Sequence, residues 1–90
     1  MALFFLVALQ DSAPAVEVAV SAKVAAGSVY EIESGKWILD SPATTSKDLA
    51  DSLGITDGVP FFIVPVRGYF GRAQPDLWEW LAAKTAAKAL

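Results

Sequence analysis

The segment 67–72 concentrates the residue types that could bind a charged or aromatic ligand. It reads Arg-Gly-Tyr-Phe-Gly-Arg and holds two of the seven basic residues of the chain. An arginine can pair with a phosphate or carboxylate through two hydrogen bonds, and an aromatic ring can stack on a nucleobase. The glycines would let the backbone approach a ligand closely. Arg67, Tyr69 and Arg72 are therefore the candidate ligand-binding or nucleic-acid-binding residues.

A structural role for the same segment is the interpretation that we prefer. In that role the aromatic rings pack under a C-terminal helix, and the arginines are solvated or pair with Asp76 and Glu79. The net charge of −3 also disfavours nucleic acid as a partner, because non-specific binding depends on neutralising phosphates.

The chain contains no Cys and no His, which limits the kinds of catalysis that it can perform. Disulfides, thiolate catalysis, histidine-based triads and the usual zinc sites are thereby excluded. Any metal would need oxygen ligands, and the spacing of Asp48, Asp51 and Asp57 matches no calcium loop. We predict no metal and no cofactor, and we lean against enzymatic activity. Asp11 is the single catalytic candidate, although a helix-capping role suits it better. Either Ser12 or Asp11 can cap the helix that follows.

Two continuous apolar runs must position these residues. Residues 3–9 carry no charge and are rich in Phe and Val, which is typical of a strand buried on both faces. Residues 59–66 form the second run, and its two prolines place it at the edge of a sheet. In residues 13–26 apolar and polar side chains alternate in part, as in a strand. The many alanines and the glycine at position 27, which suits the end of a helix, favour a helix instead. We therefore predict a helix over residues 13–26.

The remaining pattern predicts a β-hairpin and two more helices. Residues 28–32 and 37–40 read as two strands, and the turn between them contains Gly, which is typical of a β-hairpin. Thr45 and Asp48 form a capping box, and Gly54 stops the helix that follows. A proline begins the last helix, whose charges suit its dipole. The expected elements are strands at 3–9, 28–32, 37–40 and 59–66, and helices at 13–26, 45–53 and about 75–88.

This order of elements predicts an α+β fold in a single domain over residues 1–90. The plan is a ferredoxin-like βαββαβ antiparallel sheet with an added C-terminal helix. Its first and last strands are apolar on both sides, so the face away from the two helices also needs a cover. Because 54% of the chain is hydrophobic, we predict a homodimer or a protein partner there. The interface candidates are Phe5, Phe62, Trp78 and Trp80.

The function expected from these features is a small non-catalytic interaction or assembly module that self-associates through an apolar sheet face. We expect it to be cytoplasmic, with no membrane contact. One alternative is a nucleic-acid-binding or metal-dependent nuclease-like protein that uses Asp11 with Arg67, Tyr69 and Arg72. A small-ligand-binding domain of the same fold is another, since such sites consist largely of apolar walls.

Four features follow one another in the second half of the chain: Trp37-Ile38-Leu39, the Ser/Thr-rich cap Thr44-Thr45-Ser46, the short helix Asp48–Leu53 and the apolar strand Phe61–Val66. In these features the chain resembles small ferredoxin-fold proteins related to the CRISPR adaptation endoribonuclease family, including its SinR-like members. The resemblance implies the same fold and, in the nuclease members, an Asp at the end of the first strand that holds a metal together with its copy across a dimer. Asp11 comes slightly later than that position.

Overall fold

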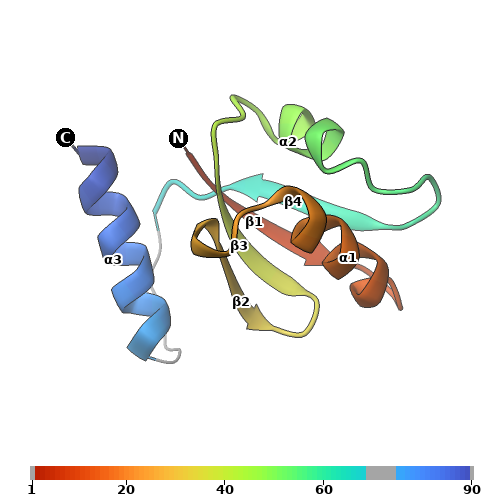
Figure 1. Ribbon diagram of the computed structural model, residues 1–90, viewed down its shortest axis with the longest axis horizontal. Coiled ribbons are helices and arrows are strands. Elements are labelled where there is room, and N and C mark those ends of the chain that lie inside the picture. The colour runs from red at the N-terminus through yellow and green to blue at the C-terminus, as the bar shows by residue number, and fades with distance from the viewer. Residues whose placement is uncertain (1, 69–74, 90) are drawn as a thin grey trace.

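The chain is built around a four-stranded antiparallel sheet with the strand order β2-β3-β1-β4. The computed structural model describes residues 2–68 and 75–89, with side chains as far as residue 85 (Figure 1). The elements are β1 (Ala2–Ala8), α1 (Ala13–Lys23), a 3₁₀ turn (Ala26–Ser28), β2 (Val29–Glu33), β3 (Lys36–Ser41), α2 (Ser46–Leu53), β4 (Phe61–Pro65) and α3 (Pro75–Ala89).

The predicted α+β architecture is confirmed. The order βαββαβ followed by a C-terminal helix is present, with β1 and β3 at the centre of the sheet and β2 and β4 at its edges. The apolar run that became β1 takes a central place because both of its faces can be buried there. The run with two prolines became the edge strand β4, because proline cannot donate a ladder hydrogen bond.

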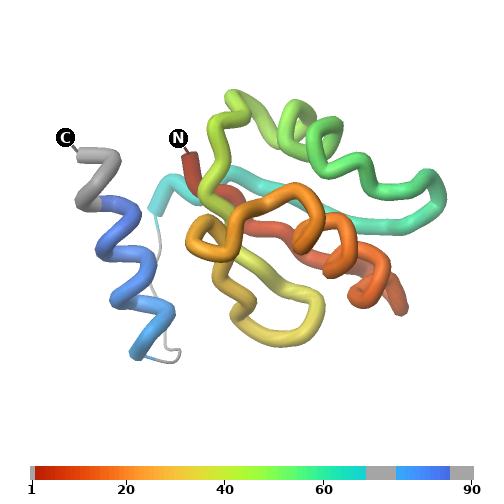
Figure 2. The backbone as a smooth tube through the Cα atoms, in the orientation of Figure 1, coloured from red at the N-terminus to blue at the C-terminus, as the bar shows by residue number. Residues whose placement is uncertain are grey.

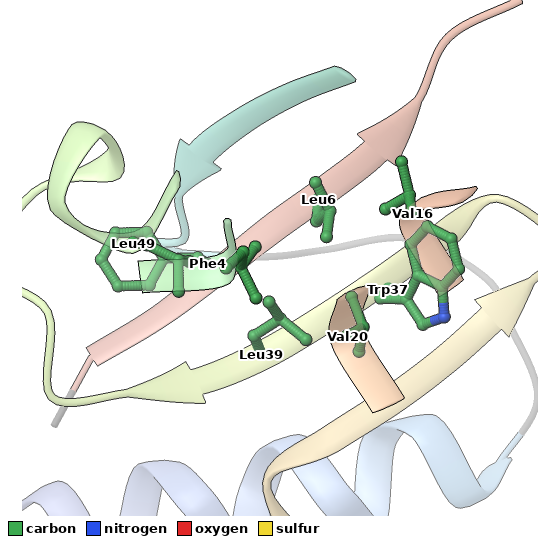
Figure 3. Packing of buried hydrophobic residues seen from close by; sticks show 8 residues of the cluster. Phe4, Leu6, Val16, Val20, Trp37, Leu39 and Leu49 are labelled. Atoms are coloured by element: carbon green, nitrogen blue, oxygen red, sulfur yellow. The ribbon is translucent and has the colours of Figure 1, made fainter. Parts of the chain in front are cut away.

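The main core lies between one face of the sheet and the helices α1 and α2. Alternate residues of β1, Phe4 and Leu6, point toward this core and are almost fully buried. Figure 3 shows the labelled side chains of β1, α1 and α2 gathered around Trp37 and Leu39 of β3. The buried members are Phe4, Leu6, Val16, Val20, Trp37, Leu39, Leu49 and Leu53.

A second and smaller core lies on the opposite face of the sheet, under α3. Leu77 and Leu81 of this helix pack against Leu3 and Ile38. The path of α3 runs well apart from α1 and α2 (Figure 2), so the sheet separates two helical layers. The added helix therefore supplies part of the cover that the two-sided apolar strands require.

The ends of the first two helices show where sequence reasoning succeeded and where it failed. The Thr45 hydroxyl accepts a hydrogen bond from the Asp48 N–H at 3.1 Å, and Gly54 takes a left-handed φ of 63°, so both predicted ends of α2 are confirmed. The prediction that α1 extends to residue 26, with Gly27 as its end, is wrong, because the helix stops at Lys23. Val24 becomes extended there and packs against the main core.

No helix in the described part of the chain is both long and apolar enough to cross a bilayer.

Candidate protein-interaction surface

The part of the second sheet face that lies over β1 and β4 carries an apolar surface that α3 covers incompletely, with Phe5 at its border still packed against the second core. We call it the open patch, and it consists of Phe5, Val7, Phe62 and Val64. The pairing register places Phe5 opposite Val64 and Val7 opposite Phe62, so the four side chains form two neighbouring rows on one face. Phe62 exposes 52% of its surface, and the other three are partly buried.

The patch contains no charged residue. Leu9 continues its face beyond the end of β1 and is 42% exposed. A contiguous exposed apolar surface of this kind typically marks a site of protein contact. The open patch includes two of the predicted interface residues, Phe5 and Phe62. Val7 and Val64 were not predicted, although alternation along each strand could have identified them.

The other two predicted interface residues, Trp78 and Trp80, lie on α3 and pack against the second core. The Trp80 ring is 5.9 Å from the ring of Tyr30 between centroids, and the Lys84 ammonium lies 5.6 Å from the Trp80 ring. Both tryptophans therefore have contacts within the chain itself.

Electrostatic contacts also hold α3 against the sheet. Lys84 Nζ lies 3.9 Å from the carboxylate of the buried Asp40 on β3. Partial burial, together with a hydrogen bond to Asp76 and the negative charge of that carboxylate, raises the pKa of Tyr30. Both pairs join α3 to the strands on which it rests, so they orient the helix over β2 and β3.

The outer edge of β4 is the second feature of this surface. Leu9 N–H donates to Pro60 C=O, and Val66 N–H donates to Leu3 C=O. The backbone groups at the even-numbered positions of this segment therefore face β1. By the alternation of an antiparallel ladder, the N–H and C=O groups of Phe61 and Ile63 face outward. No backbone hydrogen bond joins these two residues to any other segment that the structure describes.

The junction between β1, α1 and β4 is held by Ser12. Sequence reasoning offered Asp11 or Ser12 as a side-chain cap of α1, but Ser12, at the N-cap position, makes no side-chain cap hydrogen bond. Its hydroxyl instead lies 2.5 Å from the carbonyl oxygen of Leu9 and 2.7 Å from that of Pro60. Because Pro60 has no N–H to give to Leu9, Ser12 supplies the donor that the ladder lacks.

Of the residues predicted for a ligand or catalytic site, the structure describes Arg67 and Asp11, and these two lie far apart. Arg67 is exposed just beyond the end of β4, beside the start of β1, whereas Asp11 is exposed past the opposite end of β1. Seven residues of β1 separate the two ends, on the order of 20 Å. Tyr69 and Arg72 lie outside the described residues. A site that uses Asp11 and Arg67 together is thus not formed within one copy.

Other chemistry on the described surface is limited. Among the described residues no three carboxylates lie close enough together to hold a metal ion. A groove of about 390 Å³ lies between α1 and β2, with Trp37 among its lining residues and two exposed carboxylates, Glu17 and Glu31, beside it. The groove supplies apolar contact, negative charge and the hydroxyl of Ser21.

Comparison of the chain with protein-family models, with curated proteins and with solved structures finds no match in any of the three. The resemblance to the CRISPR adaptation endoribonuclease family stays a prediction, and the functional argument rests on the geometry of this chain.

Proposed function

We propose that the protein is a small, non-catalytic interaction and assembly module that self-associates through the open patch. The observation that carries this proposal is the 52% exposure of Phe62 within an uncharged apolar row. A small domain has little apolar area with which to stabilise itself, so leaving such a row in water is costly unless a partner covers it.

The absence of Cys and His from the whole chain supports a non-catalytic role. The general base most often used near neutral pH and the strongest protein nucleophile are both missing. The separation of Asp11 from Arg67 removes the support that sequence reasoning gave to a nuclease-like site within one copy.

The test is the mass of the protein in solution, measured by size exclusion with light scattering over a dilution series. We expect a dimer in the wild type and a shift to monomer in Phe62→Ser. Val18→Ser is the matched control, because Val18 on α1 is 70% exposed but lies on the opposite layer. A wild type that is monomeric at every concentration, or an equal loss of dimer in both variants, would reject the proposal.

A further inference from the structure

We infer that the partner at this surface is a second copy of the chain, paired antiparallel along the outer edge of β4 and centred on Phe62. This inference rests on the proposed self-association and specifies its geometry. Two copies would form one continuous eight-stranded sheet, a number that follows from the four strands of each.

Unpaired backbone groups along the outer edge of β4 support this pairing. Within β4 the outward N–H groups are those of Phe61 and Ile63, since Pro65, the next outward residue, has none. When the pairing is centred on Phe62, Phe61 of each copy faces Ile63 of the other, and both residues exchange N–H and C=O in full. Shifting the centre to Ile63 would place Phe61 opposite Pro65, which leaves the Phe61 carbonyl without a donor.

The positions of the side chains along β4 favour the same register. At the centre of this register, Phe62 stands directly opposite its own copy, in the pair type that brings Cα atoms to about 4.5 Å. The most exposed aromatic side chain of the sheet would then be covered by its counterpart. Val64 would lie opposite Pro60 of the other copy, so the row remains apolar across the seam.

The charges at the two ends of the β4 edge are complementary between copies. No charged residue lies between Asp57 and Arg67, so the two edges do not repel each other. Asp57 precedes Phe62 by five residues and Arg67 follows it by five. Antiparallel pairing centred on Phe62 therefore brings Arg67 of each copy beside the turn that carries Asp57 of the other. Both residues are exposed, and no ion pair to either is found within the described part of the chain.

The opposite edge of the sheet is not suited to the same pairing. β2 presents the exposed carboxylates Glu31 and Glu33, and its ladder is irregular between these two residues. Charges and bulges are the usual devices that prevent strand addition at an edge. β4 carries no charge and no bulge, and its one proline, Pro65, lies at the end of the strand, so the N–H groups of Phe61 and Ile63 remain able to pair.

The test combines charge reversal with mixing. Arg67→Asp and Asp57→Arg each place like charges at both ends of the seam, and we expect each to raise the dimer dissociation constant about tenfold at low salt. An equimolar mixture of the two variants restores opposite charges at both ends and should return the affinity to the wild-type value. That recovery would also show that both variants are folded.

A second readout fixes the register. Because the chain has no Cys, Phe62→Cys introduces a single thiol, and the central pair would place two of them within disulfide range. Phe62→Cys removes the central ring and so weakens the dimer as Phe62→Ser does, but a disulfide traps the pairs that form, so we expect covalent dimers on mild oxidation of a concentrated solution of Phe62→Cys and none for Val18→Cys. A wild-type dimer with no recovery on mixing and no Phe62→Cys cross-link overturns the β4 pairing and leaves self-association standing. A monomeric wild type overturns both.

Discussion

Replacing Ser12 by Ala should destabilise the protein without altering its surface. The Ser12 side chain is buried, and its hydroxyl lies between the carbonyl oxygens of Leu9 and Pro60. A hydroxyl has one proton, so it donates to one of the two carbonyls at a time. Each carbonyl also keeps a backbone donor, because Ser12 N–H bonds to Leu9 and Leu9 N–H bonds to Pro60, both at 3.1 Å.

The loss is therefore one buried hydrogen bond with no carbonyl left fully unpaired, which corresponds to about 1 kcal/mol. For a small domain this equals a fall of about 1 M in the urea midpoint, with an unchanged slope, or a fall of roughly 4–8 °C in the melting temperature. Ser12→Val should cost more, about 2–3 kcal/mol, because its methyl groups must fit into the same buried space.

Urea denaturation followed by circular dichroism measures this loss. Ser21→Ala is the control, because Ser21 is exposed on α1 and alanine is a better helix former. If Ser12→Ala and Ser21→Ala have the same free energy of unfolding, the hydroxyl does not tie β4 to the start of α1 and the reasoning is refuted. Because Pro60 immediately precedes β4, the same variants report whether the edge strand depends on this junction.

Two further perturbations test the hairpin turn and the contact between α3 and the sheet. Gly35→Ala should lower the free energy of unfolding by about 1–2 kcal/mol, because Gly35 has a left-handed φ of 87°. Gly27→Ala is the control and should be nearly neutral in the same denaturation assay, because a Cβ atom added at Gly27 would have no neighbour within 4 Å. Tyr30 has a raised pKa, caused first by desolvation and then by Asp76, so the folded state binds its proton more tightly than the unfolded state does. Its contribution to stability is complete below the ordinary tyrosine pKa of about 10 and is lost as the pH rises through the folded pKa. Absorbance titration at alkaline pH in a Tyr69→Phe background should show this shift, and Asp76→Asn should reduce it; an unchanged titration would show that Asp76 does not act on Tyr30.

The features that sequence reasoning predicted are those set by neighbouring residues. Thr45 and Gly54 determine the ends of α2 through contacts within a few residues, and both were predicted. Pro65, the proline within β4, suits the edge position, because its missing N–H would face outward, where no strand of the chain pairs with β4. The end of α1 was missed because helix propensity favoured continuation, whereas Val24 is extended and packs against the main core.

The features that escaped prediction depend on contacts between distant segments. Predicting the open patch requires knowing that α3 covers β2 and β3 but leaves Phe62 exposed and Val7 only partly buried. Ser12 looked like a helix cap because nothing near it in the sequence indicates a partner, and Pro60 lies 48 residues away. Asp11 and Arg67 could be combined in one hypothetical site only while the direction of β1 relative to β4 was unknown.

The proposed pairing also explains how assembly would stop at two copies. An isologous contact uses the β4 edge of both chains, so the outer edges of the combined sheet are the two copies of β2. Those edges carry Glu31 and Glu33 beside an irregular ladder, which opposes the addition of a further strand. Along the seam itself, Pro65 ends the ladder of outward N–H donors after Ile63, which disfavours registers shifted toward the C-terminal end of β4. The charges on β2 and the proline at the end of β4 therefore have complementary effects: the charges oppose open-ended growth, and the proline disfavours a slipped pairing in that direction.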